Sequence, residues 1–463
     1  MDEKKILALY DFASKQNFIY RTSKIREISG ASAMLAEAFK KFPAVLEADA
    51  DCNVVMKYDL SDTFTLDKFN NGAADAEVLY DGGGSLMVLY KSREKYVEAN
   101  RAVSKNLLLN YPTLSLIACG VEYTGDFKAD RERLYAENAR RKNCYPASDI
   151  PAVTPVTQVD PSTFMPVVKK VTVPYEQSLS ADRAAKQKCF IPSENDKLES
   201  LEGLTAVIYI DGNSMGQKLK KCESEFYEDG VARLRSFSKN VHELFVTAPL
   251  DAISKATGDT GYRQVIGGGD EITIICQAEK AWDLVCKYFE TLGSKDLEIT
   301  DMEGKVVSQG PCYSCAGIAV FHSKTPFNIV YEIAEAACES AKEKSRTDNG
   351  NYVDFYYCHA GITDDFKSLR KAQQVHATAR PYKFEEAKAT FERLAPVLRK
   401  AERSNVKALG SAAQESYERY MFEVKRVNAY LPADSEKFSG TEEEMRTIYD
   451  MSEFYDLWFA KEG

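Results

Sequence analysis

The sequence predicts an α+β protein with two β-α-β-β-α-β units in tandem, followed by a helical region. Three observations predict this fold class. Two glycine-rich turns, each between apolar strand candidates, lie at similar places in the two halves of the chain. Seven of the fifteen prolines fall between positions 146 and 192, where they separate the halves. Beyond position 365, apolar residues recur at helical spacing.

The first unit is predicted over residues 1–145. Its elements, in order, are a strand at 6–10, a helix at 31–39, a hairpin of strands 77–80 and 85–90 around the turn 81–84, a helix at 93–110 and a strand at 114–119. This is the element order of the ferredoxin-like sandwich.

The second unit, over residues 201–364, repeats that order and indicates a tandem duplication. Its first strand, 204–210, is a continuous apolar run, which is typical of a central strand buried on both faces. The remaining elements are helices within 214–247, a hairpin of strands 262–266 and 270–276, a helix at 279–292 and a strand at 315–321.

The proline-rich stretch 146–200 is predicted to be a linker, because its prolines exclude a continuous helix or a central strand. Its apolar residues still allow it to be ordered against the flanking domains. The last domain, 365–463, is predicted to be a packed helical cap with helices at 384–401, 408–430 and 442–459, the first carrying a stripe of Phe391, Leu394, Val397 and Leu398.

Composition limits the classes of partner. The 463 residues include 60 Lys and Arg against 70 Asp and Glu, a net charge of −10, so long nucleic acid is not the default partner. Local basic pockets for nucleotides remain compatible with this charge. No apolar run reaches the roughly 18 residues that span a bilayer, so we expect a cytoplasmic protein without a membrane partner. Cys312 and Cys315 form a single C-x-x-C, which does not support a four-cysteine zinc site.

The first candidate site follows the buried strand 204–210. Asp211 comes directly after it, and Gly212-Asn213-Ser214-Met215-Gly216 turns into a helix. Glycines allow the backbone to approach a ligand, and free N–H groups can bind a phosphate. The same residues are also ordinary for a turn with a helix cap.

The second candidate is the hairpin tip Gly268-Gly269-Asp270-Glu271. If the tip lies beside Asp211, its carboxylates can converge on Mg²⁺ or Mn²⁺, which prefer oxygen ligands. Because successive strand residues face opposite ways, both acids face the cleft only if the turn distorts the pleat, and Asp270 is favoured. The alternative is a solvated surface hairpin.

These motifs carry a family resemblance. Together with Ser314 to His322 and Ala341-Lys342, they occur in the order seen in palm-domain polymerase/cyclases. They resemble most the second palm domain of the large subunit of type III CRISPR effector complexes, and residues 11–20 are similar to the opening of that subunit's first palm. The tip Gly-Gly-Asp-Glu replaces the family's usual Gly-Gly-Asp-Asp and is nearer to that of diguanylate cyclases.

The resemblance implies a nucleotidyltransferase that converts a nucleoside triphosphate, with ATP as the expected substrate, into a cyclic di- or oligonucleotide signal in antiviral defence. Asp211, Asp270 and Glu271 would hold two Mg²⁺ or Mn²⁺ ions. The residues that would bind the nucleotide are Gly212, Asn213, Ser214, Met215, Gly216, Gly268, Gly269 and Lys342. An RNA or protein activator and a homo-oligomer are further expectations. Lys342 also suits a helix end without any ligand.

The first unit has Gly82-Gly83-Gly84-Ser85 at its tip, without acids at the metal positions, so it is not expected to be catalytic. It is expected either to bind the acceptor nucleotide near Asp81 and Ser85 or only to cover the second unit. None of the four histidines precedes an Asp, so the family's nuclease activity is not expected and a free-standing relative is favoured. Two alternatives stay open: a non-catalytic palm scaffold that binds nucleotide or RNA within an effector complex, and a cyclase that uses GTP.

Overall fold

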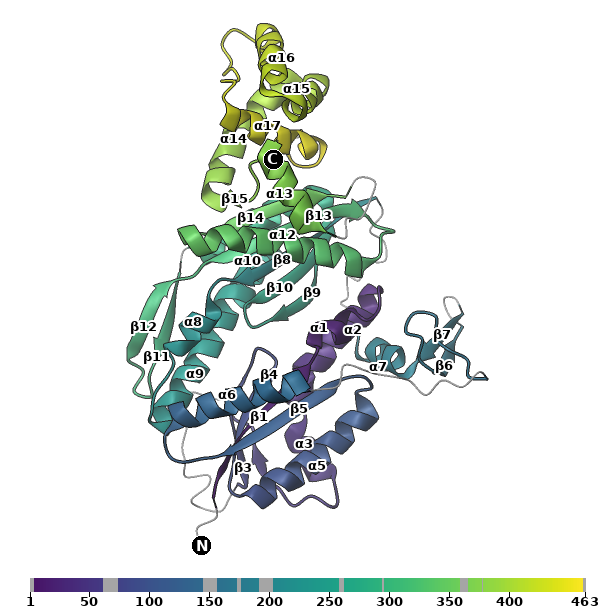
Figure 1. Cartoon of the computed structure of the whole chain (residues 1–463), viewed down its shortest axis with the longest axis vertical. Coiled ribbons are helices and arrows are strands. Elements are labelled where there is room, and N and C mark those ends of the chain that lie inside the picture. The colour runs from purple at the N-terminus through teal and green to yellow at the C-terminus, as the bar shows by residue number, and fades with distance from the viewer. Residues whose placement is uncertain are drawn as a thin grey trace.

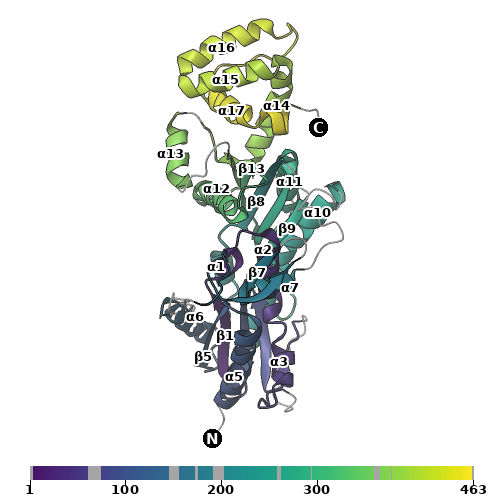
Figure 2. The same ribbon diagram turned by 90° about the vertical axis from the view of Figure 1, so that its right-hand side faces the viewer.

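The protein contains two main β-sheets, with a helical region beyond the second (Figures 1 and 2). The computed structural model describes residues 4–60, 74–144, 156–172, 176–190, 203–257, 262–293, 295–358, 365–376 and 378–460. Within these residues, no helix is long and apolar enough to cross a membrane.

The first sheet has the strand order β2-β3-β4-β1-β5. Strand β1 pairs antiparallel with both β4 and β5. Its alternate residues enter two different hydrophobic clusters, so β1 is buried on both faces. The strands are β1 (Ile6–Ala13), β2 (Met56–Lys57), β3 (Ala76–Gly82), β4 (Ser85–Tyr90) and β5 (Ser115–Glu122).

Helices cover both faces of this sheet. Helices α3 and α5 share a hydrophobic cluster with Tyr10 and Phe12 of β1, whereas α6 packs on the opposite face. Helix α2 reaches across to β9 of the second sheet (Figure 1). The helices are α1 (Lys15–Tyr20), α2 (Ile25–Ala38), α3 (Phe42–Ala48), α5 (Arg93–Asn110) and α6 (Phe127–Cys144).

The second sheet has the strand order β15-β14-β13-β8-β10-β9. Its central strand β8 pairs antiparallel with β10 and β13, as its continuous apolar run predicts, and β13 pairs parallel with β14. The strands are β8 (Leu204–Gly212), β9 (Tyr262–Gly268), β10 (Glu271–Gln277), β13 (Ser314–His322), β14 (Tyr352–Tyr357) and β15 (Tyr382–Lys383). A separate hairpin, β11 (Asp296–Thr300) and β12 (Val306–Pro311), precedes β13.

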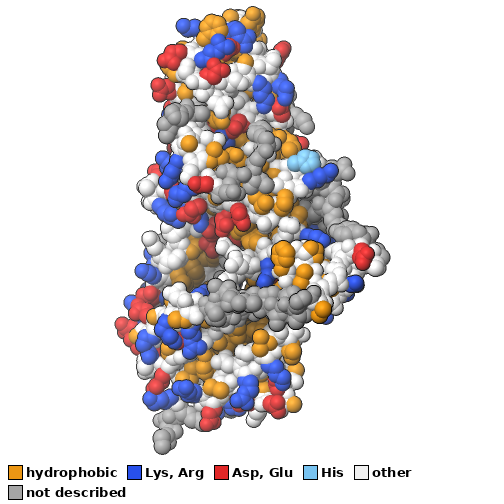
Figure 3. Space-filling view, turned by 45° about the vertical axis from the view of Figure 1, so that its right-hand side comes forward, with side chains coloured by type: hydrophobic (Ala, Val, Ile, Leu, Met, Phe, Trp, Pro, Cys, Tyr) orange, Lys and Arg blue, Asp and Glu red, His pale blue; other side chains and the backbone are white. Residues whose placement is uncertain are grey.

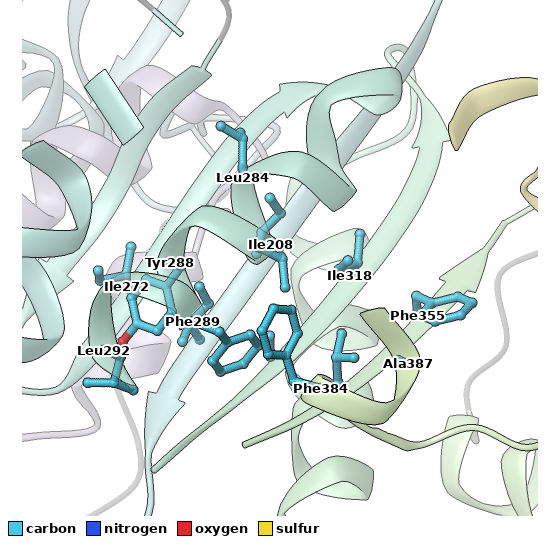
Figure 4. Packing of buried hydrophobic residues seen from close by; sticks show 14 of the residues in the cluster. Ile208, Ile272, Leu284, Tyr288, Phe289, Leu292, Ile318, Phe355, Phe384 and Ala387 are labelled. Carbon is cyan, nitrogen blue, oxygen red and sulfur yellow. The ribbon is translucent and has the colours of Figure 1, made fainter. Parts of the chain in front are cut away.

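The two faces of β8 pack against different helices. Ile208 faces a core shared with α11 and α14, where Tyr288, Phe289 and Phe384 pack together (Figure 4). Tyr209 faces α12, where it meets Tyr331 at a centroid distance of 5.5 Å. The helices are α8 (Met215–Lys220), α9 (Tyr227–His242), the π-helix η2 (Glu243–Thr247), α10 (Ala248–Thr257), the 3₁₀ turn η3 (Ala278–Lys280), α11 (Ala281–Leu292) and α12 (Phe327–Asp348).

The C-terminal region is helical, as predicted, and extends the core of the second sheet. The apolar stripe of α14, including Phe391 and Leu398, is buried as its spacing predicts. The expected helix 408–430 is instead two helices, because Ser416 leaves the helical conformation and its side chain caps the second one. The elements are α13 (Phe366–His376), α14 (Phe384–Ala401), α15 (Arg403–Glu415), α16 (Tyr417–Tyr430), α17 (Glu442–Glu453) and the π-helix η4 (Tyr455–Phe459).

The described part of the proline-rich stretch carries secondary structure that its composition does not predict. A hairpin of β6 (Val167–Val171) and β7 (Gln177–Ser180) leads into helix α7 (Ala181–Cys189). Gly30 of α2 packs against the backbone of Lys186 in α7. This segment is therefore docked on the first half rather than being an extended connection. Strand β14 and the β11–β12 hairpin were likewise not predicted from the sequence.

Candidate functional site

The centre of the candidate site lies at the ends of two neighbouring strands. In the antiparallel register of β8 and β10, Asp211 lies directly opposite Glu271. Opposed residues of an antiparallel pair point to the same face of the sheet, so both carboxylates emerge on the face that α12 covers. The register therefore brings two of the predicted acids together.

Asp270 joins them from the turn. Gly269 has φ +64°, and Asp270 is the last turn residue before β10 begins. A Cβ placed on Gly212 would lie 2.7 Å from Oδ2 of Asp270, which shows how closely this side chain crosses the end of β8. Strand alternation favoured Asp270 over Glu271 as the acid that faces the cleft. Both converge on Asp211, because Asp270 belongs to the turn and not to the pleated strand.

A lysine on α12 lies beside these three acids. Lys342 Nζ forms an ion pair with Asp211 Oδ2. The pair forms because α12 packs very closely on β13: a Cβ on Gly317 would overlap the carbonyl oxygen of Ala334 and lie 2.5 Å from the backbone nitrogen of Cys338. Lys342 is thus placed by a glycine-mediated helix–strand contact that is distant in the sequence.

Burial and mutual repulsion raise the pKa values of two carboxyl groups at this site. Burial raises the pKa of Asp270 to about 7, and the charge of Asp211 contributes to this rise, against the attraction of Lys342. Burial likewise raises the pKa of Glu271 to about 7, helped by the charges of Asp211, Glu335 and Asp270. The group therefore carries more carboxylates than Lys342 can neutralise, which favours a bound cation.

Glu335 and Gln16 also surround this acidic group and were missed from the sequence. Burial, together with repulsion from Glu332 and Asp211, raises the pKa of Glu335. Gln16 Nε2, from α1 of the first half, donates a hydrogen bond to Glu335 Oε1 at 3.0 Å. The spacing of Glu335 and Lys342, two helical turns apart, places them on one face of α12 and was the available signal.

A basic pocket of about 270 Å³ adjoins the acids. Asn213 is held there by its Nδ2, which donates to Ser345 Oγ at 2.6 Å, and by its backbone N–H, which donates to Tyr313 O at 2.8 Å. The pocket is lined by Gly212, Asn213, Ser214 and Gln217, the cations Lys218, Lys221, Lys342 and Arg346, and Pro311, Tyr313, Ser345 and Asn349.

Several predicted nucleotide-binding residues lie outside this lining. Met215 packs toward the core, and a Cβ placed on Gly216 would have no neighbour within 4 Å. Gly268 and Gly269 lie at the hairpin tip, away from the lining. Helix α8 has only six residues, and the Ser214 side chain does not cap it, so phosphate binding by its N-terminal N–H groups stays a prediction. The pocket itself is lined by the loop 212–214 and by cationic side chains.

Comparisons with known proteins agree with this geometry. Residues 204–350 match the family model described as Cas10/Cmr2, second palm domain. This segment is similar to the second palm domain of the Cas10/Cmr2 family. The match contains Asp211, Asp270, Glu271 and Lys342, so the resemblance stated from the sequence is confirmed for the part that carries the site.

Solved structures show the same fold over most of the chain. Csm1 in T. onnurineus aligns with a TM-score of 0.56 at 12% identity, covering 97% of this chain and 70% of that one. A Csm1–Csm4 cassette in complex with pppApApA aligns with a TM-score of 0.58 at 13% identity, covering 97% and 69%. The cassette in complex with cA3 aligns with a TM-score of 0.56 at 12% identity, covering 100% and 70%. No curated protein matches the sequence.

The first sheet has a counterpart of the opposed residues Asp211 and Glu271. Asp11 lies opposite Ser85, at the place that corresponds to Asp211 opposite Glu271, and Lys142 of α6 pairs with Asp11 at 2.5 Å. Lys15 pairs with the same carboxylate at 2.8 Å. Two lysines neutralise the Asp11 carboxylate, and the residue opposite it is Ser85 rather than an acid. This site therefore lacks the excess of carboxylates found in the second sheet.

The two expected acceptor residues of the first half lie on opposite faces of its sheet. Asp81 lies opposite Leu86, the neighbour of Ser85, so Asp81 and Ser85 point to opposite faces of the sheet. Asp81 accepts a hydrogen bond from Tyr58 and is half-buried there. The acceptor role of Asp81 and Ser85 stays a prediction, because the register shows only that their side chains point to opposite faces.

The tips of the two hairpins approach one another. A Cβ on Gly269 would lie 3.9 Å from the Cα of Gly83, and Gly83 O accepts a hydrogen bond from Lys15 Nζ at 3.1 Å. A space-filling view shows a hollow between the upper and lower parts of the molecule, with acidic side chains at its upper margin (Figure 3). The hairpin tip of the first half thus lies next to the hairpin tip that carries Asp270.

The donor set of the palm fits a hard divalent cation. Within the residues that the structure describes, no group of three or more His, Cys, Asp or Glu side chains is arranged to hold a metal ion. Mg²⁺, however, is commonly held by one or two carboxylates, with water and substrate phosphates completing the shell. Asp211 with Asp270 or Glu271 meets that requirement. Cys312 and Cys315 are both buried and free, so the C-x-x-C contributes to the core.

Proposed function

We propose that the protein is a metal-dependent nucleotidyltransferase that makes a cyclic di- or oligonucleotide from a nucleoside triphosphate, with ATP as the expected substrate. The observation that carries the proposal is the convergence of Asp211, Asp270 and Glu271 beside a pocket with four cationic side chains. A metal-binding acidic edge next to a phosphate-binding pocket is what transfer of a nucleotidyl group requires.

Asp211 and Asp270, with Glu271, would hold Mg²⁺ or Mn²⁺. Bound there, the metal would lower the pKa of a ribose hydroxyl and stabilise the charge on the leaving pyrophosphate. In the reaction, the hydroxyl oxygen forms a bond to the α-phosphorus, the bond from that phosphorus to the bridging oxygen breaks, and pyrophosphate leaves. The hydroxyl proton passes to a carboxylate of the acidic group, and no protein nucleophile takes part.

The chain itself would bind the triphosphate. Lys342 lines the pocket and contacts Asp211, so it can move between the carboxylate and a phosphate oxygen. Lys218 and Lys221 add positive charge on the other walls, where Arg346 also lies, paired with Glu339 at 2.8 Å. Asn213, held by Ser345, keeps the loop backbone in place at the entrance. Related folds in complex with pppApApA support an adenine nucleotide as the ligand.

The strand orders support two ferredoxin-like palms in tandem, over residues 1–145 and 201–364, with the segment 146–200 between them and the helical region 365–463 after them. In this proposal the first palm is not catalytic, because Asp11 is neutralised by Lys15 and Lys142. Its Ser85 face supplies the acceptor side of the cleft. Csm4-type subunits occur with the structural neighbours, so a protein partner belongs to the proposal.

The test is an incubation of the purified protein with each nucleoside triphosphate and Mg²⁺ or Mn²⁺, with products identified by mass spectrometry. We expect a cyclic product and pyrophosphate from ATP, and neither from the Asp270→Ala/Glu271→Ala variant. If only GTP gave a product, the protein would instead be the GTP-using cyclase given above as an alternative. No product under any metal, with or without target RNA and partner subunits, would contradict the proposal.

The second candidate is a non-catalytic scaffold that binds nucleotide or RNA in an effector complex. The Lys342–Asp211 ion pair favours it, because a lysine already occupies one carboxylate of the acidic group. Binding of ATP separates the two candidates: a scaffold binds ATP equally well with EDTA and with Mg²⁺, whereas the proposed enzyme binds it more tightly with Mg²⁺.

A further inference from the structure

A second cavity among the described residues lies outside the palm site. It has a volume of about 580 Å³ and is formed between α12, β15, α14 and α17, where the helical region meets the edge of the second sheet. The charged side chains on its walls include Lys344, Lys383, Glu386, Arg393, Glu443 and Arg446. Small-molecule sites commonly have volumes of 300–1,000 Å³.

Two of the cavity's cations have no carboxylate partner among the residues that the structure describes. Lys383 pairs with Asp348 at 3.2 Å, and Arg393 pairs with Glu436 at 2.6 Å. Within the described ranges, by contrast, neither Lys344 nor Arg446 forms an ion pair. Arg446 uses Nη1 to donate to the carbonyl oxygens of Gln374 and Thr378, which fixes the guanidinium in place. Lys344 on α12 and Arg446 on α17 therefore offer unneutralised positive charge from two different walls.

The wall behind these cations is built from a satisfied polar network. Arg380 is fully buried and pairs with Asp450 at 3.0 Å and with Glu453 at 2.6 Å. Tyr382 donates from its hydroxyl to Asp450 at 2.6 Å. Because these internal charges compensate one another, the network holds the cavity open without engaging Lys344 or Arg446.

Carboxylates and hydroxyls supply the remaining recognition groups. Glu386 and Glu443 line the cavity and form no ion pair within the part of the chain that the structure describes. Hydroxyl groups of Thr390 and Ser439 also line it. A pair of cations together with acceptor carboxylates suits a ligand that has both a phosphate and hydroxyl donors. A carboxylate that accepts hydrogen bonds from a ribose is a common arrangement in nucleotide sites.

We propose that this cavity is a second nucleotide site, which binds a nucleoside phosphate with its phosphate between Lys344 and Arg446 and its ribose hydroxyls toward Glu386 and Glu443. The site is separate from the palm pocket, but the two adjoin the same helical turn: Lys344 lies between Lys342 and Ser345, which both line the palm pocket. A bound nucleotide would therefore contact the last turn of α12, and the site is placed to regulate the palm.

The test measures binding rather than activity, so it does not depend on the proposed reaction. Full-length protein is titrated with AMP in EDTA by calorimetry, as wild type and as the Lys342→Ala, Lys344→Ala and Lys344→Ala/Arg446→Ala variants. We expect Lys342→Ala to retain this AMP site. Each lost charged hydrogen bond should weaken binding about 10-fold or more. Lys425→Ala, an exposed lysine on α16, is the matched control and should bind like wild type.

Ribose recognition is tested with Glu386→Gln/Glu443→Gln. We expect this variant to lose affinity for AMP and to bind inorganic phosphate like wild type. Thermal unfolding verifies that each variant is folded, and Lys344→Ala alters an exposed side chain, so it remains interpretable if Arg446→Ala does not fold. Unchanged AMP affinity in Lys344→Ala, loss of the site in Lys342→Ala, or equal behaviour of AMP and phosphate in all variants would overturn the proposal.

Discussion

At the scale of single residues, the acidic group depends on the missing side chain of Gly212. A Cβ there would lie 2.7 Å from Oδ2 and 2.9 Å from Cβ of Asp270. We therefore predict that Gly212→Ala displaces Asp270 and lowers the rate of the proposed reaction at least about 10-fold, since a misplaced ligand of the proposed metal loses much of its effect. Product formation and the unfolding temperature are measured together.

Gly216→Ala is the matched control for that substitution. Gly216 lies in α8 with open space around it, so alanine should leave activity unchanged and stabilise the protein by up to about 1 kcal/mol. If Gly212→Ala were as active as Gly216→Ala, the position of Asp270 beside Gly212 would not be needed for activity.

The raised pKa of Asp270 predicts a pH-dependent stability. Its value of about 7 lies above the ordinary carboxyl value of 3.8, so the folded protein holds a proton that the unfolded chain releases. The free energy of unfolding therefore falls as pH rises from about 4 to 7, because the buried Asp270 carboxyl resists ionisation in the folded protein. In EDTA, Asp270→Asn should be more stable than wild type at pH 8, by roughly 4 kcal/mol, and close to it at pH 4.

Denaturant unfolding at the two pH values measures this difference. Mg²⁺ should stabilise wild type at pH 8, because the cation favours the ionised carboxylates, and should have less effect on Asp270→Asn. An equal effect of Mg²⁺ on both proteins would exclude Asp270 as a metal ligand.

At the scale of elements, the contact between β13 and α12 places Lys342 and Glu335. Gly317 allows the strand to touch the helix backbone at Ala334 and Cys338. We predict that Gly317→Ala destabilises the protein by about 2–4 kcal/mol, because backbone cannot move aside as a side chain can. Equilibrium unfolding measures this, and Gly310→Ala, which has open space in β12, should change stability by under about 1 kcal/mol.

The segment with α7 is held on the first half by a buried ion triad. Arg183 pairs with Glu27 of α2 and with Asp160, each at 2.8 Å, and all three side chains are nearly inaccessible to solvent. Removing the central cation takes the positive charge away from two buried carboxylates, so Arg183→Ala should cost about 3–5 kcal/mol locally. Hydrogen exchange in residues 176–190 should rise sharply, and Lys188→Ala, with an exposed side chain, should leave it unchanged.

Acid should release the same segment. Although burial opposes it, hydrogen bonds from the backbone of Ser180 and Ser162 and the charge of Arg183 hold the pKa of Asp160 below its ordinary value. Its contribution to stability is present above the ordinary pKa and is lost as pH falls through the lower, folded value. Protection factors in residues 176–190, taken relative to the intrinsic exchange rate at each pH, should fall below pH 4, and unchanged protection would contradict this role.

At the scale of the whole molecule, the two sheets share their hydrophobic clusters. Leu7 and Ile208 belong to one cluster, and Tyr10 and Tyr209 to the other. Arg235 of α9 also crosses between the halves, donating to the carbonyl oxygens of Val78 and Leu79 in β3. We infer that the two halves unfold together.

Calorimetry of Arg235→Leu tests this cooperativity. The substitution leaves two carbonyl groups of β3 without the guanidinium that binds them, so the unfolding temperature should fall. We expect one transition that moves as a whole. A transition that separates into two, with only the first half destabilised, would show that the halves are independent.

Much of this molecule could be predicted from local patterns. The burial of β8, the glycine hairpin before Glu271 and the stripe of α14 follow from apolar periodicity and turn chemistry, which act over a few residues. The missed strand β14 has the same explanation: its run of aromatic residues is recognisable as a strand only when a parallel partner, β13, is already in place. Helix α7 was hidden because prolines flank it without interrupting it.

The sequence by itself determined the candidates for metal and phosphate binding: Asp211, Asp270, Glu271 and Lys342 are recognisable in their motifs. Only the tertiary structure decided which of them meet. The register placed Glu271 opposite Asp211, and a single close contact at Gly317 placed Lys342. The register also separated Asp81 from Ser85, and packing added Glu335 and Gln16. The physical reason is that motif chemistry is local, whereas convergence depends on strand register and helix packing between residues far apart in the chain.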